Sequence, residues 1–575
     1  MRQLRPRYIV FLIGILMMVS GIGMAYGTQT NLGTVQTTQF YLITSEGVPI
    51  HSTLQVPNAA TPASPLPGVI VIHGVMGTKE WIMGFGIELA RRGFVVLTID
   101  AVGHGNSGPS LGSGTDRGGI VALEFLDSLP YVSTIGMVGH SMGSGIASQA
   151  MNVSSVQVDS FVIVGGGGLV NSTYPNNVLI VTGLYDELFN IPGMLDALAT
   201  PFNTTAPVIP GQLYGSFVTG TARKVVIPQS NHLFEIVDPY AISESVDWLL
   251  NSLKGSPDAY WIPAQNQIYP IWILGGLLAC IGAILSVLAL FTILIRFGPF
   301  RQIQQSPNSS YFASTPVYLG LGLLYGVSGL VTLFALLLVD IPLYFTQGLG
   351  LSVALGLLAG GLVTLLILLG IKFYQIKKSK NPPTWNDYGG FNGKPTHLVK
   401  IIGLGFLLGF IGIAWLYLWV LPVDLLLALD FRAFLPFLKA VSPVRATYIP
   451  VYFLLLLPFV LIEALWIMGL LRTAPRDRWC TTQTVWTVKA IFIKILLYAS
   501  IIIIQTLGSI AIGSSLISGS IGFQLIYLYM FIPFFAVSTT VIAWSYRISN
   551  RFYIAVVFNA FLFAWLMASI LPIYI

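Results

Sequence analysis

The chain has 575 residues, of which 55% are hydrophobic and only 9% are charged. Because about a quarter of the residues of an ordinary soluble protein are charged, this composition excludes that class and indicates a polytopic membrane protein. The net charge is +6, but the basic residues lie beside apolar runs, where they set the orientation of membrane spans. We therefore expect no nucleic-acid partner. Residues 28–258, however, have the composition of a soluble domain, without cysteines for a disulfide or a C-x-x-C metal site.

The first 27 residues predict a signal-anchor helix. Three arginines precede residues 8–26, which form a stretch of 19 residues without a charge. This stretch is long enough to cross a bilayer. The alternative is a cleaved signal peptide, because Gly23 and Ala25 are small residues at the spacing of a cleavage site. Both interpretations leave the basic end in the cytoplasm and place the following domain outside.

Strands that alternate with helical segments predict an α/β domain over residues 28–258. Such connections give a mostly parallel sheet with helices on both faces. Residues 203–221 lack a clear periodicity and predict a loop or a small cap. The strands are expected at residues 37–44, 48–56, 68–72, 94–99, 135–138, 158–164, 178–182 and 224–227, and helices at 81–92, 117–128 and 242–253.

A G-x-S-x-G motif follows the strand at residues 135–138. Gly139 and Gly143 flank Ser141, and small residues that begin a helix come next. This pattern predicts a nucleophile elbow, a strained strand-to-helix turn that lifts the serine oxygen clear of the sheet. Glycines at these two positions let the neighbouring backbone pass without a Cβ clash. The helix N-terminus behind the serine favours a developing negative charge.

A serine nucleophile needs a histidine base and an acid that orients the base. Among the six histidines, His232 directly follows the last strand and precedes the last helix. This position is the carboxyl edge of a parallel sheet, where ligands bind in α/β folds. We therefore predict His232 as the base; the alternative is an ordinary surface histidine. Asp186 follows the strand at 178–182 and is the predicted acid, with the adjacent Glu187 as the substitute.

With these residues in place, the domain resembles the α/β-hydrolase superfamily, nearest in pattern to its dienelactone-hydrolase-like and acylglycerol-lipase-like members. The chain order of serine, acid and histidine is that of the superfamily. The resemblance implies that the backbone N–H groups of Val75 and Met142 form the oxyanion hole. It implies no substrate, because the cap is small or absent. The matching segments are Val71-Ile-His-Gly-Val-Met-Gly77, Ile99-Asp-Ala-Val-Gly-His-Gly-Asn-Ser107, Gly139-His-Ser-Met-Gly143, Gly183-Leu-Tyr-Asp186 and Asn231-His232.

Residues 259–575 predict an all-α transmembrane domain of about eight helices, which makes nine spans with the first helix. If the N-terminus lies inside, the short inside segments hold seventeen Lys and Arg residues and the short outside loops hold three. This split supports the topology and places the α/β domain and the C-terminus outside. The loop at 422–441 predicts an interfacial helix, with a re-entrant segment as the alternative. The apolar runs lie at residues 269–295, 316–339, 347–371, 401–421, 449–471, 490–513, 520–544 and 552–573.

Glu463 and Lys494 are charged residues within these apolar runs. Charges inside a membrane are costly and are usually paired. One hypothesis is that Glu463 and Lys494 form an ion pair. The other is that Lys494 extends to the interface while Glu463 bonds to a neighbouring helix. The resemblance stated above does not extend to this part of the chain.

Together these observations predict a multi-pass plasma-membrane serine hydrolase with its active site outside. Its substrates would be carboxylic esters, and a membrane location favours lipid or other apolar esters. The expected partners are the lipid bilayer and an ester substrate, and no metal or organic cofactor is expected. Two alternatives remain. One is a transporter or channel-like protein with a hydrolase-fold binding module, and the other is a serine acyltransferase whose acceptor is not water.

Overall fold

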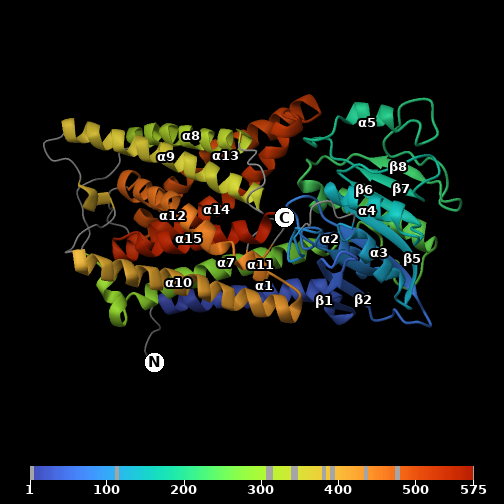
Figure 1. Ribbon diagram of the computed structural model, residues 1–575, viewed down its shortest axis with the longest axis horizontal. Helices are drawn as coiled ribbons and strands as arrows, with labels where there is room; N and C mark the ends of the chain where they lie inside the picture. The colour runs from blue at the N-terminus through green and yellow to red at the C-terminus, as the bar shows by residue number, and fades with distance from the viewer. Residues whose placement is uncertain are drawn as a thin grey trace.

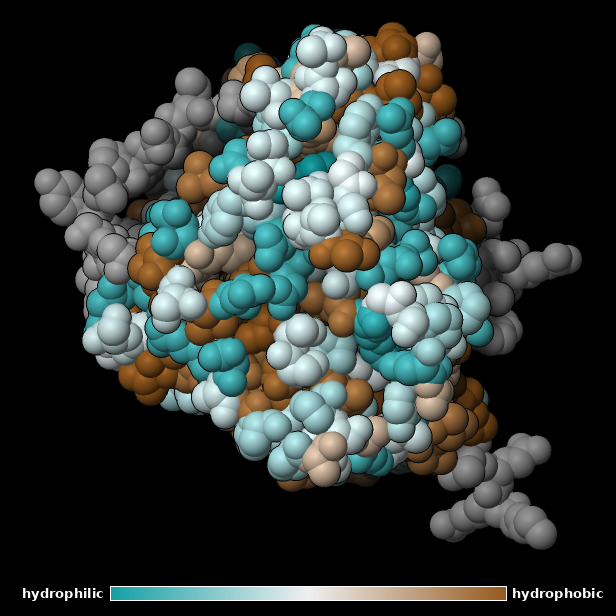
Figure 2. Space-filling model, turned by 90° about the vertical axis from the view of Figure 1, so that its right-hand side faces the viewer, coloured by the Kyte–Doolittle hydropathy of each residue, from teal (hydrophilic) through white to brown (hydrophobic). Residues whose placement is uncertain are grey.

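The computed structural model describes residues 6–109, 116–305, 315–338, 347–378, 384–388, 395–432, 438–472 and 479–573. A sheet domain, residues 31–258, lies at one end of an elongated molecule (Figure 1). A helical domain, formed by residues 6–29 and by the chain after residue 268, makes up the rest. At the end of the sheet domain that points away from the helices, polar and apolar residues are interspersed on the surface (Figure 2).

One eight-stranded sheet forms the centre of the sheet domain, with the strand order β1-β2-β4-β3-β5-β6-β7-β8. β2 pairs antiparallel with β1 and with β4, and the other neighbours pair parallel. Every predicted strand is therefore confirmed, with its ends shifted by a few residues. The strands are β1 (Val35–Ile43), β2 (Pro49–Pro57), β3 (Leu66–Ile72), β4 (Val95–Ile99), β5 (Val132–His140), β6 (Ser160–Val164), β7 (Val178–Val181) and β8 (Arg223–Val226).

Helices cover both faces of this sheet. α2 (Met83–Ala90) and α6 (Pro239–Leu249) pack on one face, and α3 (Gly119–Asp127) and α4 (Met142–Val153) pack on the other. Alternate residues of each strand face the two cores, so the central strands are mostly apolar. The core beneath α2 and α6 continues into the helical domain. The sequence analysis missed one short helix, α5 (Ile191–Ala197).

Within the described residues, eight helices are long and apolar enough to cross a membrane. The apolar part of α8, Gly320–Ala335, is shorter. Each of the nine predicted runs thus coincides with a helix, and their crossing of a bilayer stays a prediction. The helices are α1 (Pro6–Gln29), α7 (Tyr269–Leu294), α8 (Thr315–Leu338), α9 (Gly348–Lys378), α10 (Pro395–Leu427), α11 (Pro443–Ala446), α12 (Ile449–Leu465), α13 (Trp479–Ile512), α14 (Gly519–Ser549) and α15 (Tyr553–Ile570).

The structure corrects the expectation of an interfacial helix at residues 422–441. α10 continues to Leu427, and residues 428–432 and 438–441, which we call the bridging segment, contain no helix. This segment is largely buried, and Phe431 forms an isolated β-bridge with Leu438. The physical reason is its charge, because Arg432 contacts Thr78 of the sheet domain and so lies between the domains.

The sheet domain also fixes the start of α7. Oε1 of Glu88, in α2, accepts hydrogen bonds from the backbone N–H groups of Ile268 at 2.6 Å and Tyr269 at 2.8 Å. These groups lie at the N-terminus of α7 and have no partner within the helix. A carboxylate there also suits the positive end of the helix dipole. The two domains therefore share a helix cap.

Glycines bring α1 and α7 into backbone contact. A Cβ atom on Gly21 would lie 2.5 Å from the carbonyl oxygen of Gly275, and one on Gly14 would lie 2.8 Å from that of Gly282. Such close approach is the usual role of small residues between packed apolar helices. Met18, between the two glycines on α1, is fully buried.

Replacing Gly21 by leucine should separate these helices. We expect Gly21→Leu to lower the free energy of unfolding by about 1–3 kcal/mol, as overpacking commonly does. Gly23→Leu is the matched control, because nothing lies within 4 Å of its Cβ position on the same helix. The thermal unfolding midpoint of the detergent-solubilised protein measures both effects. Equal losses in the two variants would contradict the packing described here.

Candidate active site

Ser141 lies in a strained turn between β5 and α4. Its backbone has φ 52° and ψ −119°, outside the regions that most residues adopt. A Cβ atom on Gly139 would lie 2.5 Å from the backbone nitrogen of Ser144, and one on Gly143 would overlap the carbonyl oxygen of Ile72. Only glycine fits at these two positions. The predicted elbow is present, with the strand, the turn and the helix in place.

His232 lies between Ser141 and Asp186. Its Nε2 is 3.0 Å from Ser141 Oγ, and its Nδ1 is 2.8 Å from Asp186 Oδ2. Asp186 is buried, and its second oxygen accepts a hydrogen bond from the N–H of Leu188 at 2.6 Å. With an N–H on Nδ1, the imidazole would present its basic Nε2 to the serine hydroxyl. The structure therefore brings together the three predicted residues in the arrangement of nucleophile, base and acid.

Glu187, the substitute acid, does not contact the imidazole. Its Oε2 accepts a hydrogen bond from the backbone N–H of His232 at 3.2 Å. Burial raises the pKa of this carboxyl to about 7. Glu187 therefore holds the loop that carries the base, and Asp186 is the residue placed to orient the imidazole.

A buried carboxyl that the sequence analysis missed, Glu235, stands behind Asp186. Its Oε1 accepts a hydrogen bond from the N–H of Gly183, and its carboxyl lies beside that of Asp186. Burial and the neighbouring Asp186 raise the pKa of Glu235 well above its ordinary value. A protonated Glu235 places no second negative charge beside Asp186. The available signal was an acidic residue three positions after the predicted base.

The predicted oxyanion donors lie on either side of the serine. Val75 belongs to the loop that follows β3 and lines a small cavity in front of Ser141. Met142 directly follows the serine and begins α4. His73 fixes the loop that follows β3. Its Nδ1 lies 2.7 Å from the carbonyl oxygen of Gly74, and its Nε2 accepts a hydrogen bond from the N–H of Ala101 at 3.0 Å. That the N–H groups of Val75 and Met142 point at an oxyanion stays a prediction.

His140 precedes the serine and points to another partner. Its Nε2 lies 3.1 Å from the carbonyl oxygen of His232. Burial, together with the nearby His232 ring, lowers the pKa of His140 to about 3. The ligand atoms of His140, His232 and Glu235 lie within 4.8 Å of one another, close enough for a metal ion. The two ring nitrogens of His232 already face Ser141 and Asp186, so this trio does not fit a metal site.

The helical domain covers the serine. The cavity in front of Ser141 measures about 20 Å³ and is closed on one side by Phe523 and Ile526 of α14. The same helix is fixed to the loops that carry the acid and the base. The N–H of Gly519 donates to the carbonyl oxygen of Glu187 at 2.7 Å, and Asn231 donates to the hydroxyl of Tyr529 at 3.2 Å. The carboxyl edge of the sheet therefore faces the helices.

A larger cavity lies beside this one, along the same interface. It measures about 410 Å³ and lies between the loop at residues 229–239 and helices α13 and α14. Tyr529 and Phe234 meet edge to face at its wall, with ring centroids 5.1 Å apart. Gln505, Thr506 and Ser509 add polar groups from α13. The cavity gives room for part of a substrate next to the loop that carries the base.

Comparison with known families agrees with this geometry. Residues 67–289 match the family model described as the alpha/beta hydrolase fold. The sheet domain is an α/β-hydrolase domain. The resemblance predicted from the elbow and the segments around it is therefore confirmed. Below, residues 31–258 are called the hydrolase domain, and the matched stretch extends beyond them into α7.

Individual relatives match only parts of the chain. An uncharacterized protein of Mycobacterium bovis is 26% identical over 159 residues, which are 27% of this chain and 44% of the relative. The dihydrolipoyllysine-residue acetyltransferase component of the acetoin cleaving system of Cupriavidus necator is 35% identical over 112 residues, 18% of this chain and 29% of that one. The chain thus spans less than half the length of these curated relatives.

Solved structures resemble the hydrolase domain at low sequence identity. A predicted CIB-like hydrolase from Thermoplasma acidophilum is 20% identical with a TM-score of 0.28, and covers 38% of this chain and 99% of its own. An α/β serine hydrolase without a lid from Xanthomonas campestris is 15% identical with a TM-score of 0.29, and covers 39% of this chain and 97% of its own. The fold assignment rests on the family match and the sheet topology.

The predicted pair of Glu463 and Lys494 lies within the helical domain. Lys494 Nζ and Glu463 Oε2 form an ion pair, and both side chains are buried. The hydroxyl of Tyr325 donates to the other oxygen of Glu463 at 2.9 Å. Of the two hypotheses drawn from the sequence, the structure has the ion pair. Tyr325, Glu463 and Lys494 come from α8, α12 and α13 and so link these helices.

Glu187 should make stability depend on pH. Its pKa is about 7 in the folded chain against an ordinary 4.5, so the folded state keeps a proton that the unfolded state releases. The free energy of unfolding should therefore fall between about pH 4.5 and 7, by up to about 3 kcal/mol. Glu187→Gln should reduce this dependence in the thermal midpoint and leave the part that the buried Glu235 contributes, whereas Glu46→Gln, at an exposed site, should keep it in full. An unchanged profile in Glu187→Gln would contradict the assignment.

Glu463 and Lys494 should couple in a double-mutant cycle. Each single variant, Glu463→Gln or Lys494→Met, leaves its partner buried without a counter-charge, at a cost of about 3–5 kcal/mol. The double variant should lose less than the sum of the two single losses. Unfolding of the three detergent-solubilised variants measures this coupling. Additive losses would mean that the two side chains do not interact.

Proposed function

We propose that the protein is a membrane-embedded serine hydrolase that cleaves carboxylic esters. The observation that carries this proposal is the position of His232, with Nε2 3.0 Å from Ser141 Oγ and Nδ1 2.8 Å from Asp186 Oδ2. The match of residues 67–289 to the alpha/beta hydrolase family supports hydrolysis as the reaction class. The strained elbow supports Ser141 as the nucleophile.

In the first half of the reaction, Ser141 Oγ attacks the ester carbonyl carbon while His232 Nε2 takes the hydroxyl proton. Asp186 holds the imidazole by its Nδ1–H and stabilises the imidazolium that forms. The N–H groups of Val75 and Met142 bind the oxyanion of the tetrahedral intermediate. As the intermediate collapses, His232 gives its proton to the leaving alcohol, and an acyl-serine remains.

In the second half, water replaces the alcohol. His232 takes a proton from the water as its oxygen attacks the acyl carbon, and the oxyanion forms in the same hole. Collapse breaks the bond to Ser141 Oγ, the serine regains its proton from His232, and the acid leaves. Glu235, whose pKa is raised, adds no second negative charge beside Asp186 in either half.

The surroundings of the serine favour an apolar ester as the substrate. Phe523 and Ile526 of α14, with Trp81 and Leu233 of the hydrolase domain, line the space in front of Ser141. An apolar wall rewards the burial of hydrocarbon and offers no partner to a charged group. A lipid ester fits this wall, and it would approach from the side of the helices that cover the site.

The same proposal places the chain in the plasma membrane with the hydrolase domain outside. Eight described helices have the length and composition of membrane spans. The excess of Lys and Arg on the segments assigned to the inside supports an inside N-terminus. This orientation puts the active site on the outer face, next to the outer ends of the helices.

Labelling with alkyl fluorophosphonates tests this function. The purified full-length protein should be phosphonylated, Ser141→Ala should not react, and His232→Ala should react at least about 1,000-fold more slowly. A long-chain probe should react faster than a short-chain one, because its chain gains contact with the apolar wall. Ser128→Ala and His397→Ala, at exposed sites away from the triad, should label like the wild type.

Two results would sink this proposal. One is the absence of labelling in a wild type whose cooperative thermal unfolding shows that it is folded. The other is full labelling of Ser141→Ala, which would mean that another nucleophile reacts. A preference for the short-chain probe would contradict only the apolar substrate.

A further inference from the structure

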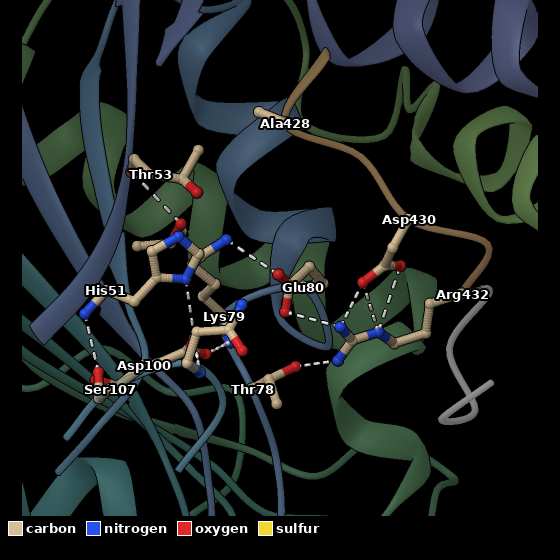
Figure 3. Close-up of polar contacts among 12 residues, drawn as sticks. His51, Thr53, Thr78, Lys79, Glu80, Asp100, Ser107, Ala428, Asp430 and Arg432 are labelled. Carbon is tan, nitrogen blue, oxygen red and sulfur yellow. Dashed lines mark hydrogen bonds and ion pairs between the residues drawn. The ribbon is translucent and has the colours of Figure 1, made fainter. Parts of the chain in front are cut away.

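A cluster of buried charges lies beside the active site, where the loop after β3 meets the bridging segment (Figure 3). The positive members come from both domains, and so do the negative ones. None of these side chains is more than 5% exposed. The six members are Lys79, Glu80, Asp100, Asp430, Arg432 and Lys439.

Arg432 reaches from the bridging segment into the hydrolase domain. Its Nη2 lies 3.1 Å from Glu80 Oε2, and its Nη1 donates to the hydroxyl of Thr78. Its Nε donates to Asp430 at 3.1 Å, which sets the plane of the guanidinium (Figure 3). A planar group with several fixed donors holds its partners in a defined geometry. Arg432 thereby fixes two positions of one short loop, Thr78 and Glu80.

The hydrolase domain holds the same loop from the other side. The N–H of Lys79 donates to Asp100 Oδ1 at 2.8 Å, and the Lys79 ammonium donates to Glu80 Oε1 at 2.9 Å. Asp100 is itself held by the N–H of Asn106 at 2.9 Å and by the ring of His51 at 3.2 Å. Residues 78–80 are therefore clamped between Asp100 and Arg432.

Burial acts to raise the pKa of Glu80, but Arg432 and Lys79 outweigh it and hold that pKa well below its ordinary value. Glu80 is therefore charged, and each of its oxygens faces a cation. A buried carboxylate that lost Arg432 would be free to seek another partner, and would move its loop. The contact between Arg432 and Glu80, which we call the tether, is consequently a strong one, because both groups are charged and buried.

The loop held in this way carries the proposed oxyanion donor. Val75 lies three residues before Thr78, and the turn between them is tight. The N–H of Gly77 donates to the carbonyl oxygen of Gly74 at 3.0 Å, and Met76 has φ 59°, a left-handed conformation. A strained turn persists only where its surroundings fix it. A shift at residues 78–80 would therefore pass directly to the N–H of Val75.

We propose that Arg432 of the helical domain is a positioning residue for the oxyanion hole, which it sets by holding Thr78 and Glu80. This inference rests on the proposed function, in which the N–H of Val75 binds the oxyanion. The helical domain then completes the catalytic machinery as well as covering it. Arg432 touches no reacting atom and acts through the loop alone.

Arg432→Lys tests this role, because lysine keeps the charge beside Glu80 but cannot reach Thr78, Glu80 and Asp430 together. Arg445→Lys is the matched control. Arg445 is also a buried arginine between the domains, and it donates to the carbonyl oxygens of Gly103 at 2.7 Å and Leu571 at 2.7 Å without touching residues 74–81. Both variants should lower the thermal midpoint to a similar extent.

The kinetic readouts differ between the two variants. With a p-nitrophenyl ester, Arg432→Lys should lower kcat by about 10- to 100-fold with little change in KM, a partial loss of what one oxyanion donor contributes. The affinity for a trifluoromethyl ketone, which forms a tetrahedral adduct, should fall by the same factor. Arg445→Lys should keep kcat within about 2-fold. Equal kcat losses in both variants, or a change in KM alone, would overturn the inference.

Two further measurements cover the remaining outcomes. If Arg432→Lys fails to fold, the double variant Arg432→Met with Glu80→Gln removes both charges at similar volume and should show the same loss of kcat. Amide hydrogen exchange at residues 74–81 is independent of activity and should be faster in Arg432→Lys than in Arg445→Lys. Unchanged exchange would refute the tether even in an active enzyme. If the wild type is inactive but exchange at residues 74–81 is still faster in Arg432→Lys than in Arg445→Lys, only the proposed function would be refuted.

Discussion

Ionised groups that lie beneath the helical domain have lost their water, and each one needs a partner or a proton, because an unpaired buried charge costs several kcal/mol. The carboxyl edge of the sheet meets this demand in two ways. Near the serine, burial and the neighbouring Asp186 raise the pKa of Glu235, so that it adds no second charge beside the partner of His232. Near the loop after β3, Glu80 keeps its charge and is paired with Lys79 and Arg432. The desolvation that makes these groups costly also strengthens their interactions, and an oxyanion formed there would gain from the same low polarity.

The two domains are consequently not independent modules. Glu88 of the hydrolase domain completes the N-terminus of α7, and α14 rests on the loops that carry the acid and the base. One of the two cores of the hydrolase domain continues into the helices, whereas the other is its own. An α/β-hydrolase fold by itself needs no such partner. Here the core beneath α2 and α6 is the one that the hydrolase domain shares with the helices.

The sequence allowed the elbow and the triad to be predicted because their signals are local. Gly139, Ser141 and Gly143 fix a turn, and His232 follows a recognisable strand. Arg432 and Glu235 were missed as parts of the site, because a charge reveals its partner only once distant segments meet. Phe523 and Ile526 gave no signal at all, since two apolar residues in an apolar helix are indistinguishable from their neighbours. The expectation for residues 422–441 failed for a related reason. Amphipathic composition suits a membrane surface and a buried interface between domains equally well, and the choice depends on the charges of Lys79, Glu80 and Asp100.

Thr78 and Arg432 are 354 residues apart in the chain. Synthesis proceeds from the N-terminus, so the loop after β3 emerges long before the arginine that holds it. During that interval Glu80 and Lys79 are hydrated and need no further partner. Closing so long a connection carries an entropic cost that the assembling helices must meet. Ser141, Asp186 and His232 of the hydrolase domain are thus synthesised early. The contacts from the helical domain form only as the bundle of helices is assembled. In the proposed enzyme, reactivity is then the final property that this chain acquires, once its helices have packed together.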